Sequence, residues 1–292
     1  MNTRILSVLW IATLIGCANS GGPNVPHEAS TPSAAVATTA PAAQPSAPAS
    51  VASALPVTRE TDTVPTSHGD LRITPIHHAT LLFQVAGAAI YLDPVHDASY
   101  EGLPKADAIF LTDIHPDHLD MAGIDAVLDP SKTVIIAPQA VADKLPKTLA
   151  QVTVMKNGEV STSKSAIVPS LGPWLGVEAV PMYNLKRGPK PGQLYHDKGR
   201  GNGYVFVFGD KRVYVSGDTE CTPEMRALKN IDIAFVCMNL PYTMPPSEAA
   251  ACIKAFRPKI VYPFHYRGSD LGELQTALAG EPGIELRLRK WY

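Results

Sequence analysis

One short segment, residues 113–118, constrains this chain more than any other. It reads Asp-Ile-His-Pro-Asp-His and follows the apolar run at residues 108–111. Histidine and aspartate are the side chains that bind zinc, iron or manganese, and here they gather where a strand gives way to a loop. A solvated polar loop is the alternative, but it would suit a lone histidine better. We therefore predict a metal site that includes Asp113, His115, Asp117 and His118.

Around this segment, the apolar pattern predicts strands and helices from about residue 70 onward. Strands are expected at residues 71–74, 80–85, 88–92, 108–111, 133–137, 177–180, 204–208, 212–215, 233–237 and 260–262. Helices are expected at residues 121–128, 139–145, 247–256 and 271–278, the third with Ser247 as its N-cap. Strand runs followed by mixed strands and helices are typical of an α/β fold in which helices cover the sheets.

The first residues resemble a targeting segment. Arg4 precedes a short apolar stretch, which is shorter than the roughly 20 residues that span a bilayer. The stretch ends in Leu-Ile-Gly-Cys, which resembles a bacterial lipobox with Cys17 as the lipidated residue. An ordinary signal peptide with an incidental cysteine is the alternative. Ala18 after the cysteine favours the outer membrane of a Gram-negative cell, facing the periplasm.

Composition divides the chain further. Residues 18–64 are rich in alanine, proline, serine and threonine and cannot bury enough apolar surface to fold. We predict residues 1–17 as a lipoprotein signal, 18–64 as a disordered tether and 65–292 as a catalytic domain. The formal net charge of −2 indicates no surface for nucleic acid. One disulfide can form among Cys221, Cys237 and Cys252, but the sequence does not choose the pair.

Three motifs in order resemble the metallo-β-lactamase superfamily. They are residues 112–118, the Val-Ser-Gly-Asp-Thr at 215–219, and the Val-Tyr-Pro-Phe-His-Tyr at 261–266. The segments at residues 76–79 and 92–94 resemble its branch of ascorbate-lactonate hydrolases and phospholipase D-like enzymes. The resemblance implies a four-layer αββα sandwich and covers residues 70–292.

The resemblance also implies two metal sites of unequal quality. Asp117, His118, Asp218 and His265 match the ligands of the family's second metal, so this second site is complete. The first site departs from the pattern, because Asp113 stands where the family has a histidine. Asn184, a much weaker ligand, falls near a further histidine position. We expect one or two divalent ions, zinc first, with manganese or iron as alternatives.

Several other side chains are expected around the metal. Asp117 would orient water and accept its proton, while His78 would act as a proton shuttle or a structural hydrogen-bond donor. Asp93 is expected to support the metal loop as a hydrogen-bond acceptor. The candidates for binding substrate are His196, Asn184, Tyr242 and Arg267.

These features predict a tethered hydrolase. A bound divalent metal generates hydroxide at neutral pH, which suits hydrolysis of an ester, a lactone or a phosphodiester. The substrate would be a small molecule or derived from lipid. The alternative is a binding module of the same fold that has lost catalysis along with its first site.

Overall fold

The computed structural model describes residues 59–149, 151–161, 168, 171 and 174–292. Cys17 and most of the expected tether lie outside these residues. Strand β1 (Asp62–Thr66) begins slightly before the expected domain start at residue 65. Its Asp62 carboxylate accepts hydrogen bonds from Tyr262 and from Arg289, which is close to the end of the chain. Within the described residues, no helix is long and apolar enough to cross a membrane.

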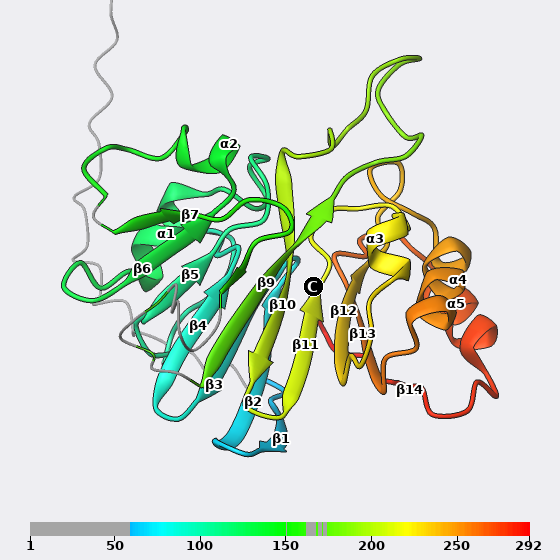
Figure 1. The fold of residues 1–292 in the computed structure, drawn as a ribbon, viewed down its shortest axis with the longest axis horizontal. Coiled ribbons are helices and arrows are strands. Elements are labelled where there is room, and N and C mark those ends of the chain that lie inside the picture. The colour runs from blue at the N-terminus through cyan, green and yellow to red at the C-terminus, as the bar shows by residue number, and fades with distance from the viewer. Residues whose placement is uncertain (1–58, 150, 162–167, 169–170, 172–173) are drawn as a thin grey trace, which may run out of the picture. The chain divides into compact units, whose positions relative to one another are not determined.

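Two mixed sheets, each of seven strands in the part of the chain that the structure describes, form the centre of the fold (Figure 1). In both sheets, strands that are consecutive in the chain are neighbours in the sheet. The first sheet contains β1, β2 (Gly69–His77), β3 (Thr80–Val85), β4 (Ala88–Leu92), β5 (Ala108–Phe110), β6 (Val134–Ala137) and β7 (Val152–Val154). The second contains β14 (Glu285–Leu286), β13 (Ile260–Phe264), β12 (Ile233–Cys237), β11 (Lys211–Val215), β10 (Gly201–Phe208), β9 (Leu175–Met182) and β8 (Val160–Ser161).

Helices cover the outer face of each sheet (Figure 1). The first sheet carries α1 (Met121–Val127) and α2 (Gln139–Ala142), and the second carries α3 (Pro223–Arg226), α4 (Pro246–Phe256) and α5 (Leu271–Leu278). Ile124 and Val141 belong to the apolar cluster on the outer side of the first sheet. The expected αββα order of layers is therefore confirmed.

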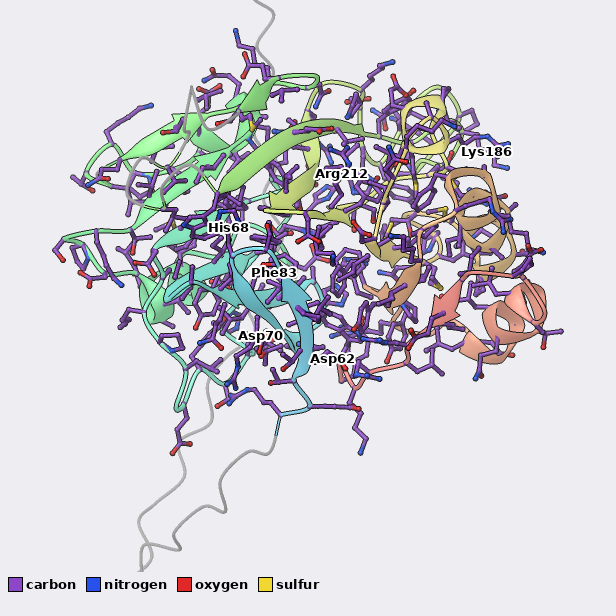
Figure 2. All side chains as sticks on the ribbon, turned by 60° about the horizontal axis from the view of Figure 1, so that its bottom comes forward. Asp62, His68, Asp70, Phe83, Lys186 and Arg212 are labelled. Atoms are coloured by element: carbon purple, nitrogen blue, oxygen red, sulfur yellow. A yellow bond between two sulfur atoms is a disulfide. The ribbon has the colours of Figure 1, made fainter. Side chains whose placement is uncertain are left out.

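Aromatic side chains fill the space between the sheets. Phe83 of β3 lies within 5.4 to 5.8 Å, ring centre to ring centre, of Phe206, Phe208 and Phe235 of the second sheet. Figure 2 shows Phe83 in this packed interior. Burial of such rings is a large apolar contribution to folding, and their edge-to-face arrangement adds to it.

Most expected elements are present, with a few differences. Ser247 is not the N-cap of α4, because Pro245 precedes the helix and no side chain caps it. Helix α2 ends at Ala142, earlier than expected. The short elements β1, β7, β8, β14 and α3 had no recognisable pattern in the sequence. Cys221 and Cys252 form the disulfide, and Cys237 is a buried free cysteine.

Candidate metal centre

The predicted ligands meet because the strands that carry them end at the same edge. Strands β2, β4 and β5 run in one direction in the first sheet, as the pairings through β3 require. Strands β9, β11, β12 and β13 likewise share a direction in the second sheet. Asp93 follows β4, residues 113–118 follow β5, Asp218 follows β11, and His265 follows β13 directly.

The second site brings all of its predicted residues together. His265 Nε2 lies 3.4 Å from Asp218 Oδ1 and 3.2 Å from Asp117 Oδ2. His118 Nε2 lies 3.4 Å from Asp218 Oδ2. His118, Asp218 and His265 are buried, and their ligand atoms lie within 4.8 Å of one another.

Two atoms of this group test whether a metal fits. His118 Nε2 and Asp218 Oδ1 are buried and have no hydrogen-bond partner. A buried polar atom without a partner is costly, so such atoms are rare in folded proteins. A divalent ion would satisfy both, because imidazole nitrogen and carboxylate oxygen are its ordinary ligands. The residues of the second site therefore fit a metal.

Hydrogen bonds behind His118 hold its ring in position. Asp93 Oδ2 accepts from His118 Nδ1 at 2.8 Å, which leaves Nε2 facing the second site. Asp93 itself accepts from the backbone N–H and the hydroxyl of Thr112. A carboxylate behind a ligand histidine fixes the ring and raises its basicity. The expected supporting role of Asp93 matches this geometry.

The first site also contains His196, which the sequence predicts as a substrate contact. Asp113 Oδ2 lies 2.7 Å from His115 Nδ1 and 3.8 Å from His196 Nε2. His196 Nε2 also lies 3.5 Å from Asp218 Oδ2, so Asp218 faces both sites. Although buried, His196 Nε2 has no hydrogen-bond partner. Asp113, His115 and His196 thus form a second group that could hold a metal.

Asn184 is buried and contacts His196, and it is not among the residues that line the cleft, so its expected role in binding substrate stays a prediction. Its Oδ1 accepts hydrogen bonds from the backbone N–H and the Nδ1 of His196, at 2.8 and 2.7 Å. Its Nδ2 donates to the carbonyl of Tyr242. Both ends of the Asn184 amide therefore have partners within the protein. Asn184 therefore lies close to the first site, as expected from the sequence. The loop that follows it places His196, and not Asn184, among the possible metal ligands.

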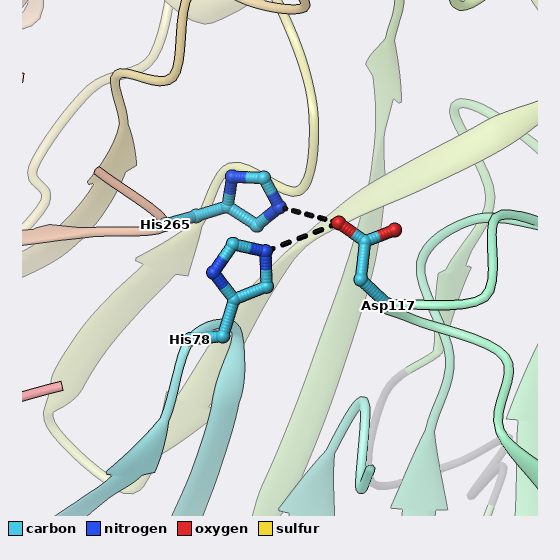
Figure 3. Close-up of side chains that lie close together, drawn as sticks. All are labelled: His78, Asp117 and His265. Carbon is cyan, nitrogen blue, oxygen red and sulfur yellow. Dashed lines mark hydrogen bonds and ion pairs between the residues drawn. The ribbon is translucent and has the colours of Figure 1, made fainter. Parts of the chain in front are cut away.

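His78 reaches the centre from the first sheet, directly after β2. Its Nε2 lies 3.1 Å from Asp117 Oδ2, the atom that also faces His265 Nε2 (Figure 3). Its Nδ1 lies 2.6 Å from the hydroxyl of Tyr292. His78 and His265 both adopt a left-handed backbone, with φ of 52° and 46°. A positive φ is uncommon for residues other than glycine, and such conformations concentrate at functional sites.

Burial and neighbouring charge set the protonation of these groups. Burial lowers the pKa of His196 and of His78 to about 4, so both rings are neutral near pH 7. Burial also acts to lower the pKa of His118, but the charges of Asp218 and Asp93 outweigh it and raise that pKa well above its ordinary value. A metal would have to displace a proton from His118 in order to bind there.

A cleft of about 480 Å³ opens over both sites. It is lined by His78, His115, Pro116, Asp117, Tyr195, His196, Asp218, Asn239, Tyr242 and Arg267. The rings of Tyr195 and Tyr242 pack edge to face, with centres 5.0 Å apart, and form an apolar wall. Arg267 is the only lysine or arginine in the lining that the described residues provide. Its guanidinium lies over the ring of Tyr292.

Comparison with known proteins agrees with this geometry. Residues 60–266 match the family model described as "Beta-lactamase superfamily domain". A crystal structure from Parabacteroides distasonis, named as a metal-dependent hydrolase, is 42% identical, with a TM-score of 0.70 over 80% of this chain and 100% of that one. A UPF0173 metal-dependent hydrolase from Aeropyrum pernix is 30% identical over 67% of this chain and 82% of its own length.

A more distant structure shares only the fold. Igni18, a metallo hydrolase from Ignicoccus hospitalis, is 20% identical, with a TM-score of 0.61 over 75% of this chain and 95% of its own. The chain belongs to the beta-lactamase superfamily, as a metal-dependent hydrolase of the metallo-β-lactamase fold.

Two residues of this centre were missed in the sequence. Arg200 pairs with Asp113, and the buried Glu220 accepts from the backbone N–H groups of residues 185–187. Neither belongs to a recognisable motif. Glu220 lies two positions after Asp218, outside the motif. Its role becomes visible only from its burial in the structure, which the sequence does not indicate.

Proposed function

We propose that this enzyme hydrolyses an ester, lactone or phosphodiester in a small or lipid-derived substrate that carries an anionic group. The observation that carries the proposal is the convergence of unpartnered ligand atoms, from His118 and Asp218, beside an open cleft that Asp218 lines. The finer resemblance to ascorbate-lactonate hydrolases and phospholipase D-like enzymes belongs to this proposal too, and rests on the segments at residues 76–79 and 92–94.

Asp117, His118, Asp218 and His265 would hold the metal, with zinc the first expectation and manganese or iron the alternatives. When bound, a divalent metal supplies a hydroxide nucleophile at neutral pH and polarises the oxygen of the bond under attack. Of these residues, Asp117 alone is substantially exposed, with 44% of its side chain accessible. It is therefore placed to orient the attacking water and to accept its proton.

His78 would keep Asp117 in place. Its Nε2 faces one carboxylate oxygen of Asp117, while the Tyr292 hydroxyl holds the opposite side of the ring. The same hydroxyl accepts a hydrogen bond from the backbone N–H of Arg267, which ties the arrangement to the loop after β13. We assign His78 as a positioning residue on these contacts.

Arg267 would bind the anionic group of the substrate. It lies at the cleft, is exposed, and forms no ion pair with any carboxylate in the described part of the chain. A guanidinium matches the geometry of a carboxylate or phosphate. The wall of Tyr195 and Tyr242 would take an apolar part of the same substrate. His196 is better placed as a metal ligand than as a substrate contact.

The enzyme would act at the bacterial envelope, attached through a lipid on Cys17 and facing the periplasm of a Gram-negative cell. The Cys221–Cys252 disulfide supports a location outside the cytosol, because disulfides persist in oxidising compartments. Labelling cells with a radioactive fatty acid tests the anchor. We expect label in the wild type and none in Cys17→Ser; equal labelling would contradict the lipoprotein assignment.

Metal content and turnover test the activity together. The purified full chain is analysed for metal and assayed with bis(p-nitrophenyl) phosphate, p-nitrophenyl esters and simple lactones. We expect stoichiometric metal and turnover of at least one class, both lost in His118→Ala. His68→Ala, an exposed histidine far along the first sheet, is the matched control and should keep both. A wild-type chain without metal or turnover would contradict the proposal and favour the binding module.

Arg267 allows a separate test of substrate class. Arg267→Met should raise KM for an anionic substrate by about tenfold while leaving a neutral ester almost unaffected. An equal effect on both substrates would argue against a role in anion binding.

A further inference from the structure

Arg200 pairs with Asp113 through both of its carboxylate oxygens. Arg200 Nε lies 3.0 Å from Asp113 Oδ1, and Arg200 Nη2 lies 2.9 Å from Asp113 Oδ2. Asp113 is fully buried, and the Arg200 side chain is only 17% exposed. A bidentate pair of this kind is among the strongest polar contacts in proteins and has a fixed geometry.

The backbone around Arg200 is pressed against the metal loop. The N–H of Asn202 donates to the carbonyl of Thr112 at 3.0 Å, and the Asn202 side chain donates to the carbonyl of Met155. Gly201 leaves no room for a side chain, since a Cβ there would lie 2.8 Å from the Thr112 carbonyl oxygen. The packing of β10 against the metal loop therefore fixes the position of Arg200 beside Asp113.

Because of this pair, the two metal sites differ in how much of their carboxylate charge is compensated by an arginine. The first site has the Asp113 carboxylate, paired with Arg200, the imidazoles of His115 and His196, and the edge of Asp218 that the two sites share. The second site has the carboxylates of Asp117 and Asp218, and within the described residues neither lies within an ion-pair distance of a lysine or arginine. Since a divalent cation binds more tightly where uncompensated negative charge is greater, the second site is favoured.

We propose that Arg200 determines how many metal ions this enzyme holds. By occupying both oxygens of Asp113, it weakens the first site, so that a single divalent ion resides at the second site. His115 and His196 then face the substrate side of the cleft beside that ion. The inference rests on the proposed function only in that the cleft binds metal.

Titration of the metal-free full chain with Zn²⁺ alone, followed by calorimetry, tests this inference. We expect one tight ion in the wild type and a second ion bound at least about 100-fold more weakly. Arg200→Met removes the charge but keeps much of the volume. It should raise the affinity for the weaker ion, which is assigned to the first site, by about 10- to 100-fold. Arg200→Lys keeps the charge and should stay close to the wild type.

Asp113→Asn provides a measurement that does not depend on replacing Arg200. It should leave the affinity for the tight ion unchanged, because that ion is assigned to the other site. Two ions of equal affinity in the wild type, loss of the tight ion in Asp113→Asn, or no tightening in a folded Arg200→Met would each overturn the inference. A chain that binds no Zn²⁺ would overturn it together with the proposed function, whereas two equal ions would leave that function standing.

Discussion

The second site and the first site use the same kinds of side chain, yet their surroundings differ. At the second site, His118 is buried, supported by Asp93, and faces the Asp218 carboxylate, with which no lysine or arginine of the described residues forms an ion pair. At the first site, Asp113 is neutralised by Arg200, and the His115 side chain is 38% exposed. Ligand identity alone therefore does not define a metal site, because the charge and burial of the neighbours set its affinity.

The largest effect should come from Asp218, the residue that faces both sites. Its Oδ1 faces His265 and its Oδ2 faces His118 and His196. Asp218→Ala should therefore abolish tight metal binding and lower kcat/KM by about a thousandfold or more. Elemental analysis and steady-state kinetics measure this, with the exposed Asp125→Ala on α1 as the matched control. Retention of one tight ion would show that the two sites are independent.

Next in size is the contrast between His265→Ala and Asn184→Ala. His265 faces the second site directly, whereas Asn184 only orients His196. We expect His265→Ala to weaken the tight ion more than 100-fold and Asn184→Ala to weaken only the other ion, by about tenfold. Competition against a chelator measures both affinities. Equal losses of the tight ion would contradict the assignment of the sites.

A smaller effect is expected from Asp93→Asn, which weakens the support behind His118. The change keeps the shape of the side chain but removes the charge that holds the Nδ1 of the ring. Metal affinity at the second site should fall by about 10- to 100-fold, as for other hydrogen-bond partners of ligand histidines. If the affinity is unchanged while the protein stays folded, His118 is positioned by packing alone.

The smallest effect concerns the loop that carries His196. Arg187 in this loop forms an ion pair with Glu248 of α4. Lys186, which is labelled in Figure 2, also forms an ion pair with Glu248. Hydrogen bonding to Arg187 lowers the pKa of Glu248 from 4.5 to about 2. Because the folded-state pKa is lowered, the contribution of this pair is complete above about pH 4.5 and is lost as the pH falls toward 2.

Glu248 is partly exposed, so solvent screening should limit this contribution to about 0.5 kcal/mol. Thermal unfolding of the wild type and of Glu248→Gln, recorded between pH 6 and pH 2, measures it. The two melting curves should differ at the upper end of that range and approach each other at the lower end. A difference that grows toward low pH would have the wrong sign and would contradict the assignment.

Long apolar runs allowed most of the fold to be predicted. Residues 233–237 form a strand whose side chains are all buried, and residues 271–278 form a helix whose buried Leu274 and Leu278 lie four positions apart, both with the expected limits. The short elements β7, β8 and β14 were missed, since two or three residues carry no period. Ser247 has the side chain of an N-cap residue, but Pro246 already begins the helix, so Pro245 occupies that position.

The sequence by itself predicted the second site, because three motifs that resemble those of the metallo-β-lactamase superfamily directly follow strands. The match of these motifs to the family's pattern assigned the four expected ligands, Asp117, His118, Asp218 and His265. Only the tertiary structure brought His196 to the first site, placed Arg200 on Asp113 and selected the Cys221–Cys252 pair. These contacts depend on how a long loop folds back across the strand edge, and no local pattern encodes that path.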